Sequence, residues 1–186
     1  SSTSRGLGDV YKRQGPGMVI KPDVIDRALL SLKSNDFPIY YLSPRGVKLD
    51  NQISNSISKL NGITLLCGKY EGVDERVIKH YNMIEISIGD YILSGGDLAA
   101  MVLIDSVVRC LPNVLGNPLT LNEETFTNYL LEYPLYTQPR EWKNYKVPDV
   151  LLSGDHKKIK NWKIKQSEDI TMKRRPDLWK KYLKLK

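Results

Sequence analysis

Three short apolar runs constrain the fold of the first 112 residues more than any other feature of the sequence. They are PIYYL at 38–42, ITLLC at 63–67 and MIEISI at 83–88. Continuous apolar runs of this length are typical of strands that are buried on both faces of a parallel sheet. Segments with helical periodicity lie around them, at 22–33, 51–60, 71–80 and 98–111. Strands alternating with helices predict an α/β fold with a parallel sheet.

Each predicted strand runs into a glycine-containing loop: SPRG at 43–46, GKYEG at 68–72 and IGDYILSGG at 88–96. One such loop is most simply a tight turn, and Gly95-Gly96-Asp97 could equally begin the following helix. Three loops at the carboxyl edge of one sheet instead favour a ligand site. Main-chain groups there could hydrogen-bond an adenine-type ring between apolar walls, for which we expect Leu42, Ile88 and Leu93.

The helix predicted at 98–111 is apolar almost all the way round. A helix of this kind is either buried within its own domain or covered by a second subunit. The sequence alone leaves both alternatives open.

The positive charge is concentrated at the end of the chain. The net charge is +7, and residues 155–186 hold 12 basic and 4 acidic side chains, whereas residues 15–154 have a net charge of −3. Three aromatic residues, Trp162, Trp179 and Tyr182, are interleaved with the basic ones. We expect the two tryptophans to be core residues of a folded basic module. The commonest partner of such a module is nucleic acid.

Several classes of protein are disfavoured by what the sequence lacks. It has two cysteines, two distant histidines, no apolar run of about 18 residues and no Walker, HExxH or GxSxG motif. We therefore expect a cytoplasmic globular protein without a disulfide framework, a metal site or a membrane span.

Changes of pattern divide the chain into four segments. Residues 1–14 have no period and are interpreted as a foreign or disordered leader. Residues 15–112 carry the strand and helix pattern, and 113–122 form a linker of Pro, Asn and Gly. Residues 123–186 are predicted to be a small, mostly helical domain in which prolines interrupt the helices.

Seven motifs in this order resemble the bacterial tRNA (guanine-N1)-methyltransferases, the TrmD family of the SPOUT class. They are GPGMV at 15–19, YLSPRG at 41–46, LLCGKYEGVDERV at 65–77, SIGDYILSGGDLAAMVLIDSVVR at 87–109, EYPLYTQP at 132–139, VPDVLLSGDH at 147–156 and KRRPDL at 173–178. The resemblance implies that residues 15–112 form a trefoil-knotted catalytic domain and that 123–186 bind the anticodon arm of tRNA. It also implies a homodimer with helix 98–111 in its interface.

The methyl donor implied by the resemblance is S-adenosylmethionine, bound by the loops of the knot. The matching positions here are Tyr41, Leu42, Ser43, Pro44, Gly68, Tyr70, Glu71, Ile88, Gly89, Asp90, Tyr91, Ile92, Leu93, Gly95 and Gly96. The family carries a further strand and helix, about 50 residues, before GPGM, and a sheet without them would expose an edge. We therefore expect this chain to be an N-terminally truncated fragment.

The implied reaction methylates N1 of the guanosine immediately 3′ of the anticodon, position 37 of the tRNA. The resemblance assigns the general base to Glu124, with Glu123 as its alternative, and the cation beside the guanine O6 to Arg109. Without the resemblance, Glu123, Glu124 and Arg109 would be interpreted as ordinary charged residues at helix ends, where they face the helix macrodipole. In the basic domain it points to His156, Arg174 and Arg175 as tRNA contacts.

The alternative to an enzyme is an inactive, truncated RNA-binding fragment of one. A related methyltransferase acting on ribosomal RNA is disfavoured, because EYPLYTQP and RRPDL belong to the second domain of the tRNA enzymes.

Overall fold

The computed structural model describes residues 7–9, 17–32, 37–114 and 125–186. They belong to two compact units, unit 1 (Ser1–Val114) and unit 2 (Leu115–Lys186). The division falls within the stretch predicted as a linker, most of which lies outside the described residues.

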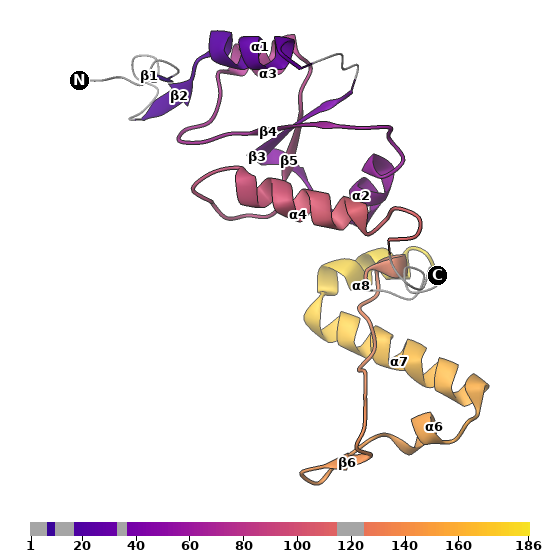
Figure 1. Ribbon diagram of the computed structural model, residues 1–186. Helices are drawn as coiled ribbons and strands as arrows, with labels where there is room; N and C mark the ends of the chain where they lie inside the picture. Colours follow the sequence, from indigo (N-terminus) through magenta and orange to yellow (C-terminus); the bar gives the residue numbers. More distant parts are fainter. Residues whose placement is uncertain (1–6, 10–16, 33–36, 115–124) are drawn as a thin grey trace. The chain divides into compact units, whose positions relative to one another are not determined.

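Unit 1 is built on a three-stranded parallel sheet with the order β4-β3-β5. Its strands are β3 (Ile39–Lys48), β4 (Thr64–Cys67) and β5 (Ile84–Ser87). In Figure 1, α1 (Pro22–Leu30) and α3 (Glu75–His80) lie on one face of the sheet, and α2 (Asn51–Ile57) and α4 (Asp97–Val108) lie on the other. The α/β fold with a parallel sheet is confirmed.

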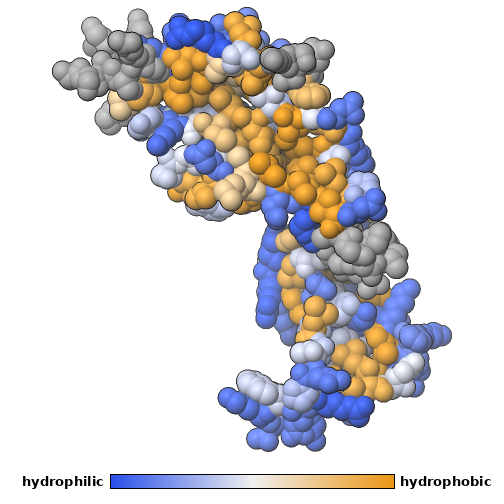
Figure 2. All heavy atoms as spheres, viewed as in Figure 1, coloured by the Kyte–Doolittle hydropathy of each residue, from blue (hydrophilic) through white to orange (hydrophobic). Residues whose placement is uncertain are grey.

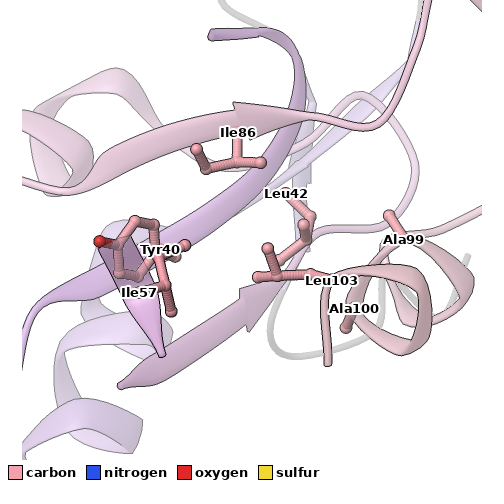
Figure 3. Close-up of a cluster of buried hydrophobic side chains, with 7 residues drawn as sticks. All are labelled: Tyr40, Leu42, Ile57, Ile86, Ala99, Ala100 and Leu103. Atoms are coloured by element: carbon pink, nitrogen blue, oxygen red, sulfur yellow. The ribbon is translucent and has the colours of Figure 1, made fainter. Parts of the chain in front are cut away.

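The alternation of side chains along β3 divides the core of unit 1 into two clusters. Tyr40 and Leu42 face α2 and α4, and their cluster, drawn in Figure 3, also contains Ile57, Ile86, Ala99, Ala100 and Leu103. Tyr41, which lies between them in sequence, faces the other way and packs with Ile25, Val77, Ile78 and Met83 from the α1 and α3 side. Neighbouring strand residues point to opposite faces, so a continuous apolar run fills both clusters.

The predicted turn at 43–46 is a bulge within β3. Leu42 and Val47 are both paired with Ile86 of β5, so the residues between them have no counterpart on that strand. Bulges of this kind re-aim a strand at functional sites. Here the bulge spans residues 43–46, and Ser43 within it is buried.

A small two-stranded ribbon precedes α1. β1 (Leu7–Asp9) pairs antiparallel with β2 (Met18–Ile20). On its other side β2 contacts the loop after β4, where the Ile20 N–H donates to the Gly72 carbonyl at 3.0 Å. The predicted leader at 1–14 therefore does not stand wholly apart from the fold, because three of its residues form a paired strand. Its remaining residues lie outside the described ones.

Unit 2 is helical from Asp149 onward. It contains α6 (Asp149–Leu152), α7 (His156–Arg174) and α8 (Pro176–Leu183), and Asp155 caps α7 by accepting hydrogen bonds from the Lys157 and Lys158 N–H groups. Residues 125–148 depart from the mostly helical prediction. They form the short 3-10 helix η1 (Thr127–Tyr129) and a hairpin of β6 (Glu141–Trp142) and β7 (Tyr145–Lys146).

The apolar helix α4 is buried on one side only. Ala99, Ala100 and Leu103 pack into the core, whereas Leu98 and Met101 are 59% and 64% exposed. Figure 2 shows apolar residues gathered on the surface of unit 1 around this helix. Within the described part of the chain, no helix combines the length and the apolar character needed to cross a membrane.

Candidate functional site

A cavity of about 820 Å³ lies at the carboxyl ends of β3, β4 and β5. Its walls come mainly from three loops, 41–45, 68–76 and 86–96, with a contribution from β2. The strands are parallel, so loops distant in sequence meet at this one edge. All but one of the predicted donor-binding residues line the cavity. They are Tyr41, Leu42, Ser43, Pro44, Gly68, Tyr70, Glu71, Ile88, Gly89, Tyr91, Ile92, Leu93, Gly95 and Gly96.

The exception is Asp90, which does not line the cavity. Its side chain is 89% exposed and pairs with Lys48 through an Nζ–Oδ2 distance of 3.1 Å. The backbone at Asp90 thus belongs to the predicted loop, while its carboxylate pairs with Lys48, the last residue of β3, at the surface.

Close backbone contact joins two of the loops. The Gly96 N–H donates to the Gly68 carbonyl at 2.8 Å. A Cβ atom added at Gly96 would lie 2.9 Å from the Cα atom of Cys67, which is closer than real Cβ atoms approach. Glycine is therefore required at 96 for loop 88–96 to rest against the end of β4.

Tyr41 forms a buried wall of the cavity. Burial raises the pKa of its phenol, although a backbone hydrogen bond with Val73 acts in the opposite direction. Gly72 lies against its hydroxyl group, and a Cβ atom there would come within 2.7 Å of the hydroxyl oxygen. The phenol is accordingly neutral at physiological pH and offers a polar atom without a charge.

A charged cluster on the cavity wall was not predicted from the sequence. Arg45 lies 3.0 Å from both Glu75 and Glu85 and so links the bulge of β3 to α3 and β5. The hydrogen bond with Glu75 raises the pKa of the Arg45 guanidinium. The second carboxylate oxygen of Glu85 is buried and has no hydrogen-bond partner among the described residues. Arg45 lies in the motif YLSPRG and Glu75 in LLCGKYEGVDERV, but the motifs did not predict that the two side chains form an ion pair.

Of the two predicted catalytic residues, the structure describes only Arg109, which does not line the cavity. Arg109 follows α4 as its C-cap residue and is exposed. Glu124 and its alternative Glu123 lie outside the described residues.

The predicted tRNA contacts occupy opposite ends of α7. His156 is the first residue of the helix and Arg174 the last, which places their backbones about 27 Å apart at 1.5 Å per residue. Arg175 sits beside Arg174 and binds Asp177 through two bonds of 2.8 and 2.6 Å. This pair raises the pKa of Arg175 and lowers the pKa of Asp177 to about 2. Arg175 thus also fixes the start of α8.

The fold and the cavity define a class of protein: an α/β domain with a ligand cavity at the carboxyl edge of a parallel sheet, followed by a basic unit. Residues 4–181 match the family described as tRNA (Guanine-1)-methyltransferase TrmD. The chain belongs to this family, and the match includes part of the segment predicted as a leader.

Curated relatives agree with the family assignment. The chain is 54% identical over 170 residues to the tRNA (guanine-N(1)-)-methyltransferase of Pelagibacter ubique, covering 91% of this chain and 75% of the relative. It is 52% identical over 169 residues to the enzyme of that name from Rhodospirillum rubrum, covering 91% and 71%. Over 181 residues it is 47% identical to that of Ruegeria pomeroyi, covering 96% and 74%.

Proposed function

We propose that the protein transfers a methyl group from S-adenosylmethionine to N1 of the guanosine immediately 3′ of the anticodon, position 37 of tRNA. The observation that carries the proposal is the cavity, where loops carrying three of the family motifs converge at one sheet edge. Family membership and the names of the relatives support the same reaction.

The cavity suits a nucleoside-sized donor. Its volume of about 820 Å³ is in the range of small-molecule sites. Leu42, Ile88 and Leu93 provide apolar wall, and the glycine-rich loops bring main-chain donors and acceptors close to a bound ring. When bound, the donor supplies a methyl group on a positively charged sulfur. The Tyr41 phenol adds an uncharged polar group to the wall of that site.

The guanine substrate requires a base and a cation. N1 of guanine holds a proton at neutral pH, so a carboxylate must take that proton as the N1–methyl bond forms and the sulfur–methyl bond breaks. We assign this role to Glu124, with Glu123 as the alternative. Negative charge develops on the guanine O6, and Arg109 is the cation assigned to stabilise it.

The basic unit 2 is assigned to the anticodon arm of tRNA. Contacts from Lys and Arg to phosphates would supply most of its affinity. His156 and Arg174 are exposed at the two ends of α7, so contacts at both would extend along the helix. Arg175 is less available because Asp177 already holds its guanidinium.

Two further features belong to this proposal, the trefoil knot of unit 1 and a homodimer. The exposed side of α4, which includes Leu98, Met101 and Val102, supports the dimer because a second subunit would cover it. A charge at its centre, Met101→Glu, is expected to shift the sedimentation of the protein from dimer to monomer. A dimer that persists in this variant would place the interface elsewhere.

The direct test is transfer of a labelled methyl group from S-adenosylmethionine to an unmodified tRNA transcript. One transcript has guanosine 3′ of the anticodon, and the matched control has adenosine there. Label in the guanosine transcript alone is the expected result. Equal label in both would contradict the proposed base, and label in neither would favour the alternative of an inactive RNA-binding fragment.

A further inference from the structure

The hairpin of unit 2 holds two aromatic rings in fixed positions. Trp142 of β6 is paired directly with Tyr145 of β7. The two residues of the turn, Lys143 and Asn144, have φ angles of 49° and 67°. Two left-handed residues are the requirement of a type I′ turn, the connection that best fits the twist of a two-stranded hairpin. The rings therefore project from a short, regular element.

Both rings are exposed to an unusual degree. Trp142 is 60% exposed and Tyr145 is 76% exposed. The other two tryptophans behave differently: Trp162 and Trp179 are half-buried, and each lies near a tyrosine ring of unit 2, at 6.3 and 5.3 Å between centroids. Those two are thus partly covered within unit 2, although neither is as fully buried as a core residue, whereas Trp142 is mostly exposed.

The surroundings of the hairpin favour nucleic acid over a protein partner. The Lys143 ammonium lies 4.8 Å from the centre of the Trp142 ring. Within the described ranges, no carboxylate lies within ion-pair distance of Arg140. Lys146 pairs with Glu141 at a long distance of 3.8 Å, and both side chains are exposed. Figure 2 shows a mostly blue and white surface over this element. Three cations, Arg140, Lys143 and Lys146, thus stand against one carboxylate, Glu141, around the two rings. Aromatic rings among an excess of cations are typical of surfaces that bind unpaired nucleotides, whereas protein interfaces have cores depleted of charge.

A second cavity borders the hairpin. It has a volume of about 650 Å³ and is lined by Arg140, Val147, Leu151, Leu152 and the segment 136–139. Figure 1 shows β6 and α6 toward the end of unit 2 where α7 begins, away from α8. His156, a predicted tRNA contact, is the first residue of α7. The hairpin and this predicted contact thus belong to the same end of the unit.

We propose that Trp142 and Tyr145 form a stacking platform for an unpaired base of the tRNA, with Arg140 and Lys143 contacting its flanking phosphates. Every base has a flat aromatic face, so stacking adds affinity without reading sequence. The inference rests on the proposed function, because it takes tRNA as the partner. It assigns to the hairpin a contact that neither the motifs nor the charge distribution predicted.

The test measures binding of an unmodified tRNA transcript to the full chain, alongside methyl transfer. Trp142→Ala and Tyr145→Ala are each expected to weaken binding about tenfold, within the range for loss of one base–aromatic stack. Trp142→Phe keeps a ring and is expected to lose less than about threefold. Leu135→Ala removes another exposed apolar side chain, 69% exposed, and serves as the matched control with unchanged binding.

Two readouts separate stacking from a structural role. Tryptophan fluorescence is expected to be quenched by tRNA in the wild type and much less in Trp142→Phe, since only a ring in contact with a base is quenched directly. In steady-state assays the alanine variants should raise KM for tRNA and leave kcat unchanged. An unchanged donor affinity would show that unit 1 is intact.

Wild-type affinity for tRNA in both alanine variants would overturn the platform, as would equal quenching in the wild type and Trp142→Phe. Loss of dimer in Trp142→Ala with unchanged affinity for tRNA would also overturn it, in favour of a protein contact. A wild type that binds tRNA through the platform but transfers no methyl group would contradict the proposed function and leave this inference standing.

Discussion

The two units are stabilised in different ways. Unit 1 contains all but one of the buried apolar residues in the described ranges, and Leu103 at its centre is fully buried. Unit 2 contributes only Leu178 to that set, and its most buried side chain is the polar Thr171. Unit 1 is thus held by two apolar clusters around a sheet, whereas in unit 2 hydrogen bonds and ring contacts carry more of the stability.

This difference matches the two proposed tasks. A small-molecule cavity needs loops held rigidly by a core, and the core of unit 1 lies directly beneath its cavity. A surface for a long polyanion needs exposed side chains over a wide area, and unit 2 provides them because few of its residues are buried. Four substitutions test this difference between the units, and they are expected to differ in the size of their effect.

Leu103→Ala is expected to lower the free energy of unfolding of unit 1 by about 3–5 kcal/mol, because it opens a cavity at a fully buried site. Chemical denaturation followed by tyrosine fluorescence or circular dichroism measures the loss. Leu30→Ala, at a position that is 72% exposed, is the control and should cost less than about 1 kcal/mol. Equal losses in the two variants would contradict the core described for unit 1.

Gly96→Ala is expected to weaken donor binding about tenfold or more, because its Cβ atom would meet the backbone at Cys67 and force the two cavity loops apart. Isothermal titration with S-adenosylmethionine measures the change. Gly95→Ala is the matched variant, since a Cβ atom there has its nearest contact at an ordinary 3.5 Å. Gly96→Ala is expected to lose clearly more affinity for the donor than Gly95→Ala, and equal losses would contradict the close contact at Gly96.

Thr171→Val tests the polar anchor of unit 2. The Thr171 hydroxyl accepts a hydrogen bond from the Leu131 N–H at 2.8 Å and donates one to the Ser167 carbonyl at 2.6 Å. Valine would leave that partly buried N–H without its partner, which costs about 1–3 kcal/mol. Ser153→Ala removes exposed hydrogen bonds that water can replace, and the thermal unfolding of unit 2 should hardly change. A tolerated valine would mean that unit 2 depends on other contacts.

The smallest effect concerns acid stability. The pKa of Asp177 is lowered in the fold from 3.8 to about 2 by Arg175. A lowered pKa means that the pair stabilises unit 2 above pH 3.8 and that this stabilisation is lost as the pH falls from there through about 2. Asp177→Asn should therefore flatten this part of an acid titration followed by helix content. An unchanged profile in Asp177→Asn would contradict the stabilising role of this pair.

The architecture of unit 1 could be predicted where local pattern and tertiary environment agree. The apolar runs at 63–67 and 83–88 predicted β4 and β5 to within two residues at each end. Strands that are buried on both faces have apolar residues at successive positions, so the run itself marks the strand. The cavity followed from topology alone, since parallel strands must end at a common edge. The donor-site residues themselves came from the family motifs.

The sequence could not predict contacts that depend on distant partners. β1 is three residues long and exists only through its pairing with β2, so it has no period to detect. The Arg45 cluster joins three elements, and no local spacing brings Glu75 and Glu85 to one guanidinium. The hairpin at Trp142 had one usable signal, an Asn in a two-residue turn between aromatic residues, which is weaker than the usual Asn-Gly.

The methyl donor is assigned to the cavity of unit 1 and the anticodon arm to unit 2, with Arg109 of unit 1 assigned to the guanine alone. Hydrogen exchange followed by mass spectrometry distinguishes these binding sites. The full chain would be measured alone, with S-adenosylhomocysteine and with unmodified tRNA. We expect the nucleoside to slow exchange in the cavity loops 41–45, 68–76 and 86–96 of unit 1, and tRNA to slow it at the hairpin and the start of α7 in unit 2. Protection of unit 2 by the nucleoside, or no protection of the three loops of unit 1, would contradict these assignments.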